Sequence, residues 1–298
     1  MSTFSGVIVP MITPFKRDEK QSINYEAGEQ LAERLIASDV SGIFTFGSNG
    51  EFHVCTPEER IGFSKFIIEK VAGRVPVLVG TGACSTYEAA EMSKKAEAIG
   101  ASAVSVINPY FMKISDAEIV GYYEAVAGSV KIPVIMYNIP KSTGMNLSPE
   151  VVAKVAEIEN VKGIKDSSGN MDNLSAYVEA CRGKDVDVLV GSDGKISAAH
   201  ALGASGAVAG TGNLIPDIVV ELWRALDEGD KEKAERLQQE IEPIRDVLHM
   251  GSTPQTLKRS LELAGVSVGP ARRPVQETTP EQDAAIRAML DHYGMRHE

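Results

Sequence analysis

Short apolar runs alternate with longer amphipathic segments along the whole first part of this chain. Eight of the runs lack regular polar alternation, so both of their faces are expected to be buried. They are Gly6–Pro10, Gly42–Phe46, Pro76–Gly80, Ala103–Ile107, Pro133–Tyr137, Val161–Lys165, Val186–Val190 and Gly206–Gly210. Runs of this kind are typical of parallel strands enclosed between layers. The pattern therefore predicts eight parallel strands.

The segments between these runs have the periodicity of helices. They include Tyr25–Ala37, Pro57–Val71, Tyr87–Ile99, Ala117–Ala127 and Glu150–Ala156. Helix-start signals precede several of them: Thr56-Pro57-Glu58-Glu59 offers an N-cap, a proline and first-turn acids, and Ser148-Pro149 repeats the device. Alternating strands and helices predict a (β/α)₈ TIM barrel. An open doubly wound sheet is the rival, but the dinucleotide-binding glycines are missing after the first strand.

The strand pattern stops after Leu226. We expect residues 1–226 to form the barrel and carry the active site. Residues 227–298 are expected to form a C-terminal extension of three helices, at 230–248, 253–264 and 279–293, packed on the barrel. The apolar positions Leu257, Leu261 and Leu263 indicate burial or a contact between subunits.

Composition narrows the classes of partner. The 298 residues are 43% hydrophobic and 24% charged, as in ordinary globular domains, and the formal net charge is −11. An acidic chain without a basic run is a poor ligand for nucleic acid. No apolar run approaches the ~20 residues of a membrane span, and no signal peptide is evident, so we expect a cytoplasmic protein. Three scattered cysteines fit a reducing compartment.

Reactive groups of barrel enzymes lie at the carboxyl ends of the strands. Lys165 ends the sixth apolar run. Desolvation there favours the neutral amine, which can attack a ketone and form a Schiff base that acts as an electron sink. The alternative is a structural lysine paired with Asp166 or Glu51.

Tyr137 ends the neighbouring fifth strand, where its phenol could transfer protons to a substrate held on Lys165. A core ring with a surface hydroxyl is the plainer interpretation. Ser48, after the second strand, could pass the proton onward. Gly47 and Gly50 would let a substrate carboxylate approach the backbone N–H groups of this loop.

Two other kinds of site remain as alternatives. A metal-dependent aldolase needs several converging His or carboxylate ligands, but only His53 lies near a strand end, with Cys55 beside it, so we predict no metal. A phosphate-binding barrel would use the glycines at 191–194 and 210–212, although Asp193 is a poor neighbour for a phosphate.

Taken together, these stretches resemble the pyruvate-dependent Schiff-base lyases of the dihydrodipicolinate synthase and N-acetylneuraminate lyase family. The matching segments are Gly47-Ser-Asn-Gly-Glu51, Gly80-Thr-Gly82, Tyr137-Asn-Ile-Pro140 and Gly163-Ile-Lys-Asp-Ser-Ser-Gly169. The similarity covers nearly the whole chain. It implies a barrel enzyme that needs neither a metal nor an organic cofactor and that assembles as a homotetramer, a dimer of dimers.

The resemblance also implies roles for single residues. Lys165 would form the imine with pyruvate or another 2-oxo acid, and Tyr137 would be the general acid/base with Ser48 as its relay. The main-chain N–H groups of Ser48 and Asn49 would hold the substrate carboxylate. Val208, at the end of the eighth strand, would lie over the imine and offer its carbonyl.

Departures from the family pattern bear on the substrate. The synthase has a relay tyrosine from the adjacent subunit where this chain has Phe111; Tyr110 is one residue away. It has a substrate-binding arginine where this chain has Ser142, with Lys141 before it. Losing a guanidinium removes a bidentate carboxylate ligand.

Other segments are similar to aldolases of 4-hydroxy-2-oxoglutarate and of 2-keto-3-deoxy sugar acids, among them the tail Gly269–Gln276. We therefore expect retro-aldol cleavage of a 4-hydroxy-2-oxo acid or 2-keto-3-deoxy sugar acid. The alternatives are condensation of pyruvate with aspartate semialdehyde, a related dehydratase, and a non-catalytic sensor of a 2-oxo acid.

Overall fold

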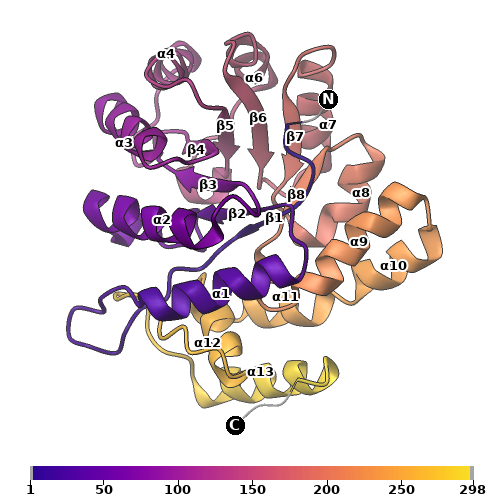
Figure 1. The fold of residues 1–298 in the computed structure, drawn as a ribbon. Coiled ribbons are helices and arrows are strands. Elements are labelled where there is room, and N and C mark those ends of the chain that lie inside the picture. The colour runs from indigo at the N-terminus through magenta and orange to yellow at the C-terminus, as the bar shows by residue number, and fades with distance from the viewer. Residues whose placement is uncertain (1–2, 296–298) are drawn as a thin grey trace.

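The strands close into a barrel. A computed structural model describes residues 3–295, and in it eight parallel strands pair in chain order, with β8 returning to β1 (Figure 1). The strands are β1 (Gly6–Pro10), β2 (Gly42–Thr45), β3 (Val77–Gly80), β4 (Ala103–Ile107), β5 (Val134–Asn138), β6 (Val161–Asp166), β7 (Asp187–Val190) and β8 (Gly206–Val208). The predicted (β/α)₈ barrel is confirmed.

Helices surround the barrel and follow the predicted segments closely. The outer helices are α1 (Tyr25–Ala37), α2 (Pro57–Val71), α3 (Thr86–Ala98), α4 (Asp116–Ala127), α6 (Pro149–Val155), α7 (Met171–Ala180), α8 (Ile196–Ala201) and α9 (Pro216–Glu228). Short helices at the barrel mouth are η1 (Phe52–Val54), α5 (Pro140–Thr143), η2 (Asp193–Lys195) and η3 (Gly210–Asn213). The capping box expected at Thr56 and Glu59 is present, which satisfies backbone N–H groups that α2 itself leaves unpaired.

A small apolar cluster fills the inside of the barrel. It contains Phe4, Ile8, Phe44, Leu78, Ala103, Ile135, Leu189 and Val208, so seven strands contribute one residue each. A larger cluster lies between the strands and the outer helices. Because side chains alternate along a strand, the inward positions of these seven strands are set by their residues in the cluster. In β6, Gly163 pairs with the inward-facing Ile135, which makes Lys165 inward as well.

The C-terminal extension differs from the prediction in one respect. Within the described residues it has four helices: α10 (Lys231–Gln239), α11 (Glu242–His249), α12 (Gln255–Leu263) and α13 (Pro280–His292). The sequence predicted a single helix over 230–248. Pro243 has no N–H to donate to the preceding turn, so α10 ends at Gln239 and α11 begins at Glu242 with this proline in its first turn. The expected boundary at Leu226 falls inside the last turn of α9.

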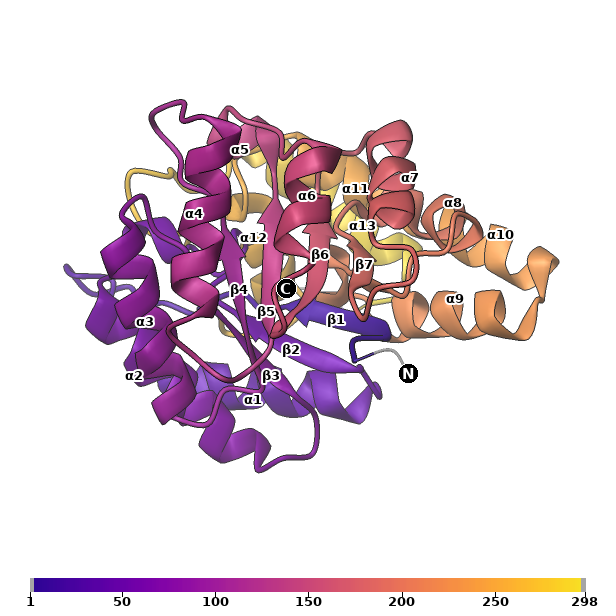
Figure 2. The ribbon, with the colours of Figure 1, turned by 90° about the horizontal axis from the view of Figure 1, so that it is seen from above.

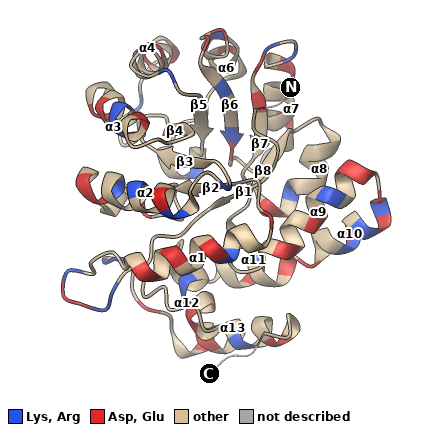
Figure 3. Cartoon of the chain, viewed as in Figure 1, with Lys and Arg blue, Asp and Glu red and all other residues tan. Residues whose placement is uncertain are grey.

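The extension packs on the barrel. Helices α11, α12 and α13 lie on the side opposite α4 and α6, and α10 runs beside α9 (Figures 1 and 2). Leu257, Leu261 and Leu263 are buried within the chain, so burial, not a subunit contact, accounts for their pattern. Both signs of charge are interspersed on the outer helices (Figure 3). Between residues 3 and 295 no helix has the length and apolarity that crossing a bilayer requires.

Candidate active site

Lys165 and Tyr137 meet inside the mouth of the barrel. They are register partners on β6 and β5, and their side chains point to the same interior. Lys165 is 5% exposed, and its Nζ lies 4.1 Å from the centroid of the Tyr137 ring and 5.3 Å from that of Phe44. The amine therefore lies next to two aromatic rings, one of which, Phe44, belongs to the interior apolar cluster.

The partners that the sequence offered for a purely structural Lys165 are engaged elsewhere. Glu51 forms an ion pair with Lys258, 2.6 Å away. The carboxylate of Asp166 accepts hydrogen bonds from the Asn138 side chain at 2.8 Å and from the Ser168 hydroxyl at 2.7 Å. This arrangement favours a chemical role for Lys165 over a structural one.

Ser48 lies against Tyr137. The two hydroxyl oxygens are 3.0 Å apart, across the mouth between the β2 loop and β5. Gly47, just before Ser48, needs to be glycine because a Cβ there would lie 2.8 Å from the Phe44 ring. The structure thus brings together three residues that the sequence proposed as one proton-transfer set.

The ends of β5 and β6 are fixed by a polar network next to the reactive pair. Asn138 and Asp166 are the register partners that follow Tyr137 and Lys165, and their side chains are hydrogen bonded to each other. Asn138 also accepts a hydrogen bond from the Leu147 backbone N–H at 3.0 Å. Buried polar groups that are fully paired hold a single geometry. The network thus keeps the two strand ends, and the tyrosine and lysine on them, in register.

The loop after β2 begins with two backbone N–H groups at the open start of a turn. Its internal hydrogen bonds are donated by Gly50 to Gly47 and by Glu51 to Ser48. The N–H groups of Ser48 and Asn49 precede these donors. The binding of a substrate carboxylate by these two groups stays a prediction. The Asn49 side-chain amide lies close to Gly210, where a Cβ would come within 2.6 Å of its nitrogen.

Val208 is the last residue of β8. Its side chain belongs to the interior cluster together with Phe44, whose ring also faces Lys165. The end of β8 therefore shares an aromatic neighbour with the lysine. The role expected of the Val208 carbonyl stays a prediction.

The backbone N–H groups that a phosphate would need after β8 already donate to a side chain of the protein. The Asp193 carboxylate accepts hydrogen bonds from the backbone N–H groups of Thr211 at 2.7 Å and Gly210 at 3.3 Å. Burial raises the pKa of Asp193, while these hydrogen bonds act in the opposite direction. A phosphate at this end of the barrel would compete with a built-in carboxylate for the same donors.

The residues that depart from the family pattern lie at the rim. Phe111 has a left-handed backbone with a φ of 83°, and its side chain is 92% exposed. Tyr110 turns the other way and packs its ring against Phe52, with centroids 6.0 Å apart. Ser142 and Lys141 are exposed on α5. Within this chain the Tyr110 ring is therefore engaged with Phe52 at the rim.

His53 and Cys55 flank Val54 at the end of η1, and burial raises the pKa of the Cys55 thiol to about 12. Among the residues from 3 to 295, no three His, Cys, Asp or Glu side chains are grouped as metal ligands would be.

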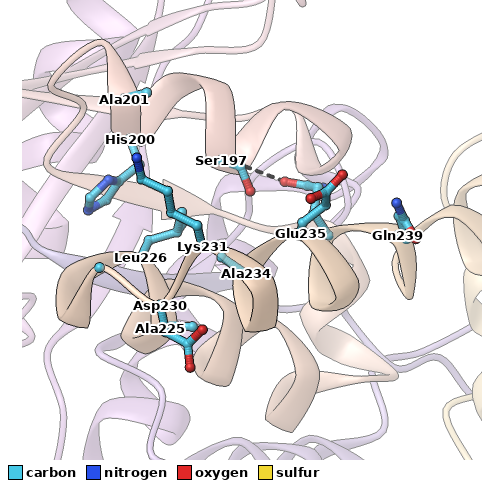
Figure 4. Close-up of a pocket in the computed structure, with 12 residues that line it drawn as sticks. Ser197, His200, Ala201, Ala225, Leu226, Asp230, Lys231, Ala234, Glu235 and Gln239 are labelled. Carbon is cyan, nitrogen blue, oxygen red and sulfur yellow. Dashed lines mark hydrogen bonds between the residues drawn. The ribbon is translucent and has the colours of Figure 1, made fainter.

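A large cavity lies away from the barrel mouth. It measures about 620 Å³ and is an open pocket between α8, α9 and α10, with Ser197, His200, Leu226 and Gln238 in its lining (Figure 4). None of the residues proposed for chemistry lines it. Its position does not change the assignment of the site to the strand ends.

An inward lysine amine above a tyrosine ring at the mouth of a closed barrel suits an enzyme that forms a Schiff base with a carbonyl substrate. Comparison with known proteins agrees. Residues 3–293 match the Dihydrodipicolinate synthetase family, and the chain belongs to this family of lyases.

Individual relatives are similar over their whole length. The 4-hydroxy-tetrahydrodipicolinate synthase of Methanosphaerula palustris is 34% identical, covering 97% of this chain and 99% of that protein. The dihydrodipicolinate synthase of Aquifex aeolicus has a similar structure, with a TM-score of 0.95 and 33% identity. The match covers 99% of this chain and 100% of that one. YagE, a prophage protein of this family from E. coli K12 whose structure was solved in complex with pyruvate, matches with a TM-score of 0.93 and 32% identity. The match covers 99% of this chain and 100% of that one.

Sequence reasoning missed residues that support the site from a distance. Asp193 holds the amides of the β8 loop, and Lys258 pairs with Glu51 at the end of the β2 loop. A signal for Lys258 exists: it lies next to Leu257 on the apolar face of α12, where a lysine is out of place. Nothing in the sequence indicates its partner, which lies more than two hundred positions earlier.

Gly191 provides a test of how tightly Lys165 is held. A Cβ at this position would lie 2.9 Å from the Lys165 Cε and would overlap the Ser167 hydroxyl. We expect Gly191→Ala to slow imine formation with pyruvate by about 10²-fold, because small misplacements of reacting groups cost that much. Gly121→Ala in α4 is the control, since its Cβ would meet no atom within 4 Å. Stopped-flow rates equal to the wild type in Gly191→Ala would contradict this account.

Proposed function

We propose that this enzyme cleaves a 4-hydroxy-2-oxo acid or a 2-keto-3-deoxy sugar acid by a retro-aldol reaction that releases pyruvate or a related 2-oxo acid. The observation that carries the proposal is the buried Lys165 amine, 4.1 Å from the ring centroid of Tyr137, whose hydroxyl meets Ser48. A candidate nucleophile on β6, an acid/base on β5 and a proton relay on the β2 loop thereby lie together at the mouth of the barrel.

The chemistry follows from these positions. The Lys165 amine attacks the 2-oxo carbon, and loss of water leaves a protonated imine. Tyr137 removes the proton of the C4 hydroxyl, the C3–C4 bond breaks, and its electron pair moves into the imine to give an enamine. An aldehyde departs from the C4 side. Protonation of the enamine at C3 and hydrolysis of the imine release the 2-oxo acid and restore the amine.

The substrate carboxylate fits the start of the β2 loop. The N–H groups of Ser48 and Asn49 would receive it, with Gly47 keeping the backbone close to Phe44. The Val208 carbonyl would face the imine from β8. Lysine supplies the electron sink in this scheme, so the reaction needs neither a metal nor an organic cofactor.

Two rim residues favour cleavage over the synthase reaction. Phe111 has no hydroxyl to extend the relay, and Ser142 on α5 cannot form the paired hydrogen bonds of a guanidinium with the second substrate's carboxylate. The names of the relatives favour the alternative, condensation of pyruvate with aspartate semialdehyde. A dehydratase would use the same imine to expel a hydroxyl group.

We also infer that the protein is a homo-oligomer, with the tetramer of the family as the expected form. Tyr87 in the first turn of α3 and Phe111 and Met112 in the loop after β4 are exposed by 76%, 92% and 67%. The Cys84 thiol, in the loop before α3, donates a hydrogen bond to the Tyr110 carbonyl and so joins the two segments. Exposed apolar clusters of this kind mark protein contacts. Three free cysteines fit the cytoplasm as its compartment.

Borohydride trapping tests the imine. Reduction in the presence of pyruvate should add one pyruvate-derived unit to the wild type, measured as intact mass, and none to Lys165→Ala. Lys162→Ala is a matched control on the same strand, because Lys162 is paired with Asp185 at 2.7 Å outside the barrel and should not affect trapping. An adduct that persists in Lys165→Ala would move the imine to another residue.

Product analysis decides between cleavage and condensation. NMR should show pyruvate released from 4-hydroxy-2-oxoglutarate or 2-keto-3-deoxygluconate with kcat/KM at least about tenfold above that for condensation with aspartate semialdehyde, a difference of about 1.4 kcal/mol in barrier. The double variant Phe111→Tyr and Ser142→Arg should shift the ratio toward condensation. Efficient condensation by the wild type with negligible cleavage would overturn the proposal in favour of the synthase.

Sedimentation velocity tests the assembly. The wild type should sediment as a species larger than a monomer, and Phe111→Ser should shift it toward smaller species by removing the most exposed apolar side chain of the rim. Met250→Ser is the control, because Met250 is also exposed but lies in the extension. A monomeric wild type at micromolar concentration would rule the oligomer out.

A further inference from the structure

A buried ion pair joins the C-terminal extension to the loop that would bind the substrate carboxylate. Lys258 on α12 and Glu51 at the end of the β2 loop are 2.6 Å apart, and their side chains are 1% and 2% exposed. The Lys258 ammonium also donates a hydrogen bond to the Pro270 carbonyl at 3.0 Å. Glu51 follows Ser48 by three residues, so the pair acts on the same short turn.

Phe15 forms the floor beneath this pair. The Lys258 nitrogen lies 4.1 Å from the centre of the Phe15 ring, and the Arg272 guanidinium lies 4.2 Å from it. Burial lowers the pKa of Lys258 to about 8, with Glu51 acting in the opposite direction. The lysine therefore depends on Glu51 and on the ring for the stabilisation that water would otherwise supply.

Arg272 ties the same turn from a second direction. Its backbone N–H donates to the Glu51 carboxylate at 2.7 Å, and its guanidinium binds both oxygens of Glu59 at 2.7 and 2.8 Å. The guanidinium also donates to the Val54 carbonyl at 2.9 Å. Two segments of the extension thus hold the stretch from Glu51 to Glu59 that follows the carboxylate-binding amides.

The turn that ends at Glu51 is also constrained by its own backbone and by the packing around it. Glu51 adopts a left-handed backbone with a φ of 57°, a conformation that a residue other than glycine keeps only when its surroundings impose it. Gly50 packs against Phe46, because a Cβ added to Gly50 would lie 2.8 Å from the backbone nitrogen of Phe46. The Thr13 hydroxyl donates to the Gly50 carbonyl at 2.7 Å. Glu51 is therefore the point at which the extension determines the direction of the loop.

We propose that Lys258 and Glu51 are positioning residues that set the affinity for the 2-oxo acid carboxylate by holding the N–H groups of Ser48 and Asn49 toward the mouth of the barrel. Neither residue touches the substrate. The proposal rests on the proposed function for the identity of the ligand. It gives the C-terminal extension a part in substrate binding, in addition to covering the barrel.

A matched pair of variants separates positioning from plain stability. Lys258 and Arg259 are adjacent on α12, but Arg259 binds Asp283 of α13 at 2.6 Å and so joins two parts of the extension to each other. Lys258→Met and Arg259→Met each remove one cation from the same helix. Only Lys258→Met loosens the β2 loop.

The expected result is a split between affinity and turnover. Lys258→Met should raise the pyruvate concentration for half-maximal borohydride trapping by about tenfold or more while the maximal adduct stays near one per chain; Arg259→Met should leave it within about twofold. Hydrogen exchange of the peptide covering residues 47–55 should accelerate in Lys258→Met alone. The proposal would be overturned if the pyruvate concentration for half-maximal trapping were unchanged in Lys258→Met, or if it rose equally in Arg259→Met.

A second variant covers the case in which Lys258→Met does not fold. Glu51→Gln is nearly isosteric, keeps an oxygen for the Arg272 N–H and removes the charge of the pair. Glu51→Gln should also raise the pyruvate concentration for half-maximal trapping, by about threefold or more. An unchanged concentration would count against the proposal. Failure of the wild type to form any adduct would instead contradict the proposed function. Hydrogen exchange, which needs no ligand, would still test whether Lys258 holds the β2 loop in place.

Discussion

The alternation of side chains along β6 is the constraint on which the site depends. In a closed barrel of eight strands every second residue faces an interior filled by side chains. Gly163 and Lys165 share the inward parity of Ile135 and Tyr137 on the neighbouring strand. An amine at that position leaves water, meets aromatic faces and lies at the floor of the mouth. A shift of register by one residue would place Lys165 among the outer helices and abolish the site.

The polar groups around this amine are arranged in closed sets. Asn138 and Asp166 pair at the strand ends, Asp193 holds the β8 loop, and Glu51 pairs with Lys258 below the β2 loop. Each of these acids is held by groups of its own strand end or loop. The site is thus framed by hydrogen bonds and an ion pair that fix the strand ends and loops around the lysine.

Local features were predictable from the sequence, and distant contacts were not. Buried parallel strands are continuous apolar runs, and helices start at capping residues such as Thr56, so both could be located from short segments. The break between α10 and α11 was missed because the amphipathic periodicity continues across Pro243. The pairing of Glu51 with Lys258 leaves no local pattern, since each partner is a single charged residue in its own segment. The contact of Tyr110 with Phe52 and the left-handed backbone at Phe111 are likewise not indicated by residue type.

Membership of the family constrains the reaction more than the substrate, for a structural reason. Lys165 and Tyr137 lie on strands whose register is enforced by the whole barrel, so the imine chemistry is tied to the fold. Phe111 and Ser142 lie on a rim loop and a short helix, where a substitution disturbs no core packing. Selection can therefore change the second substrate at the rim without altering the imine site. The 34% identity to a synthase leaves room for such a change, and Phe111 and Ser142 are where the structure would accommodate it.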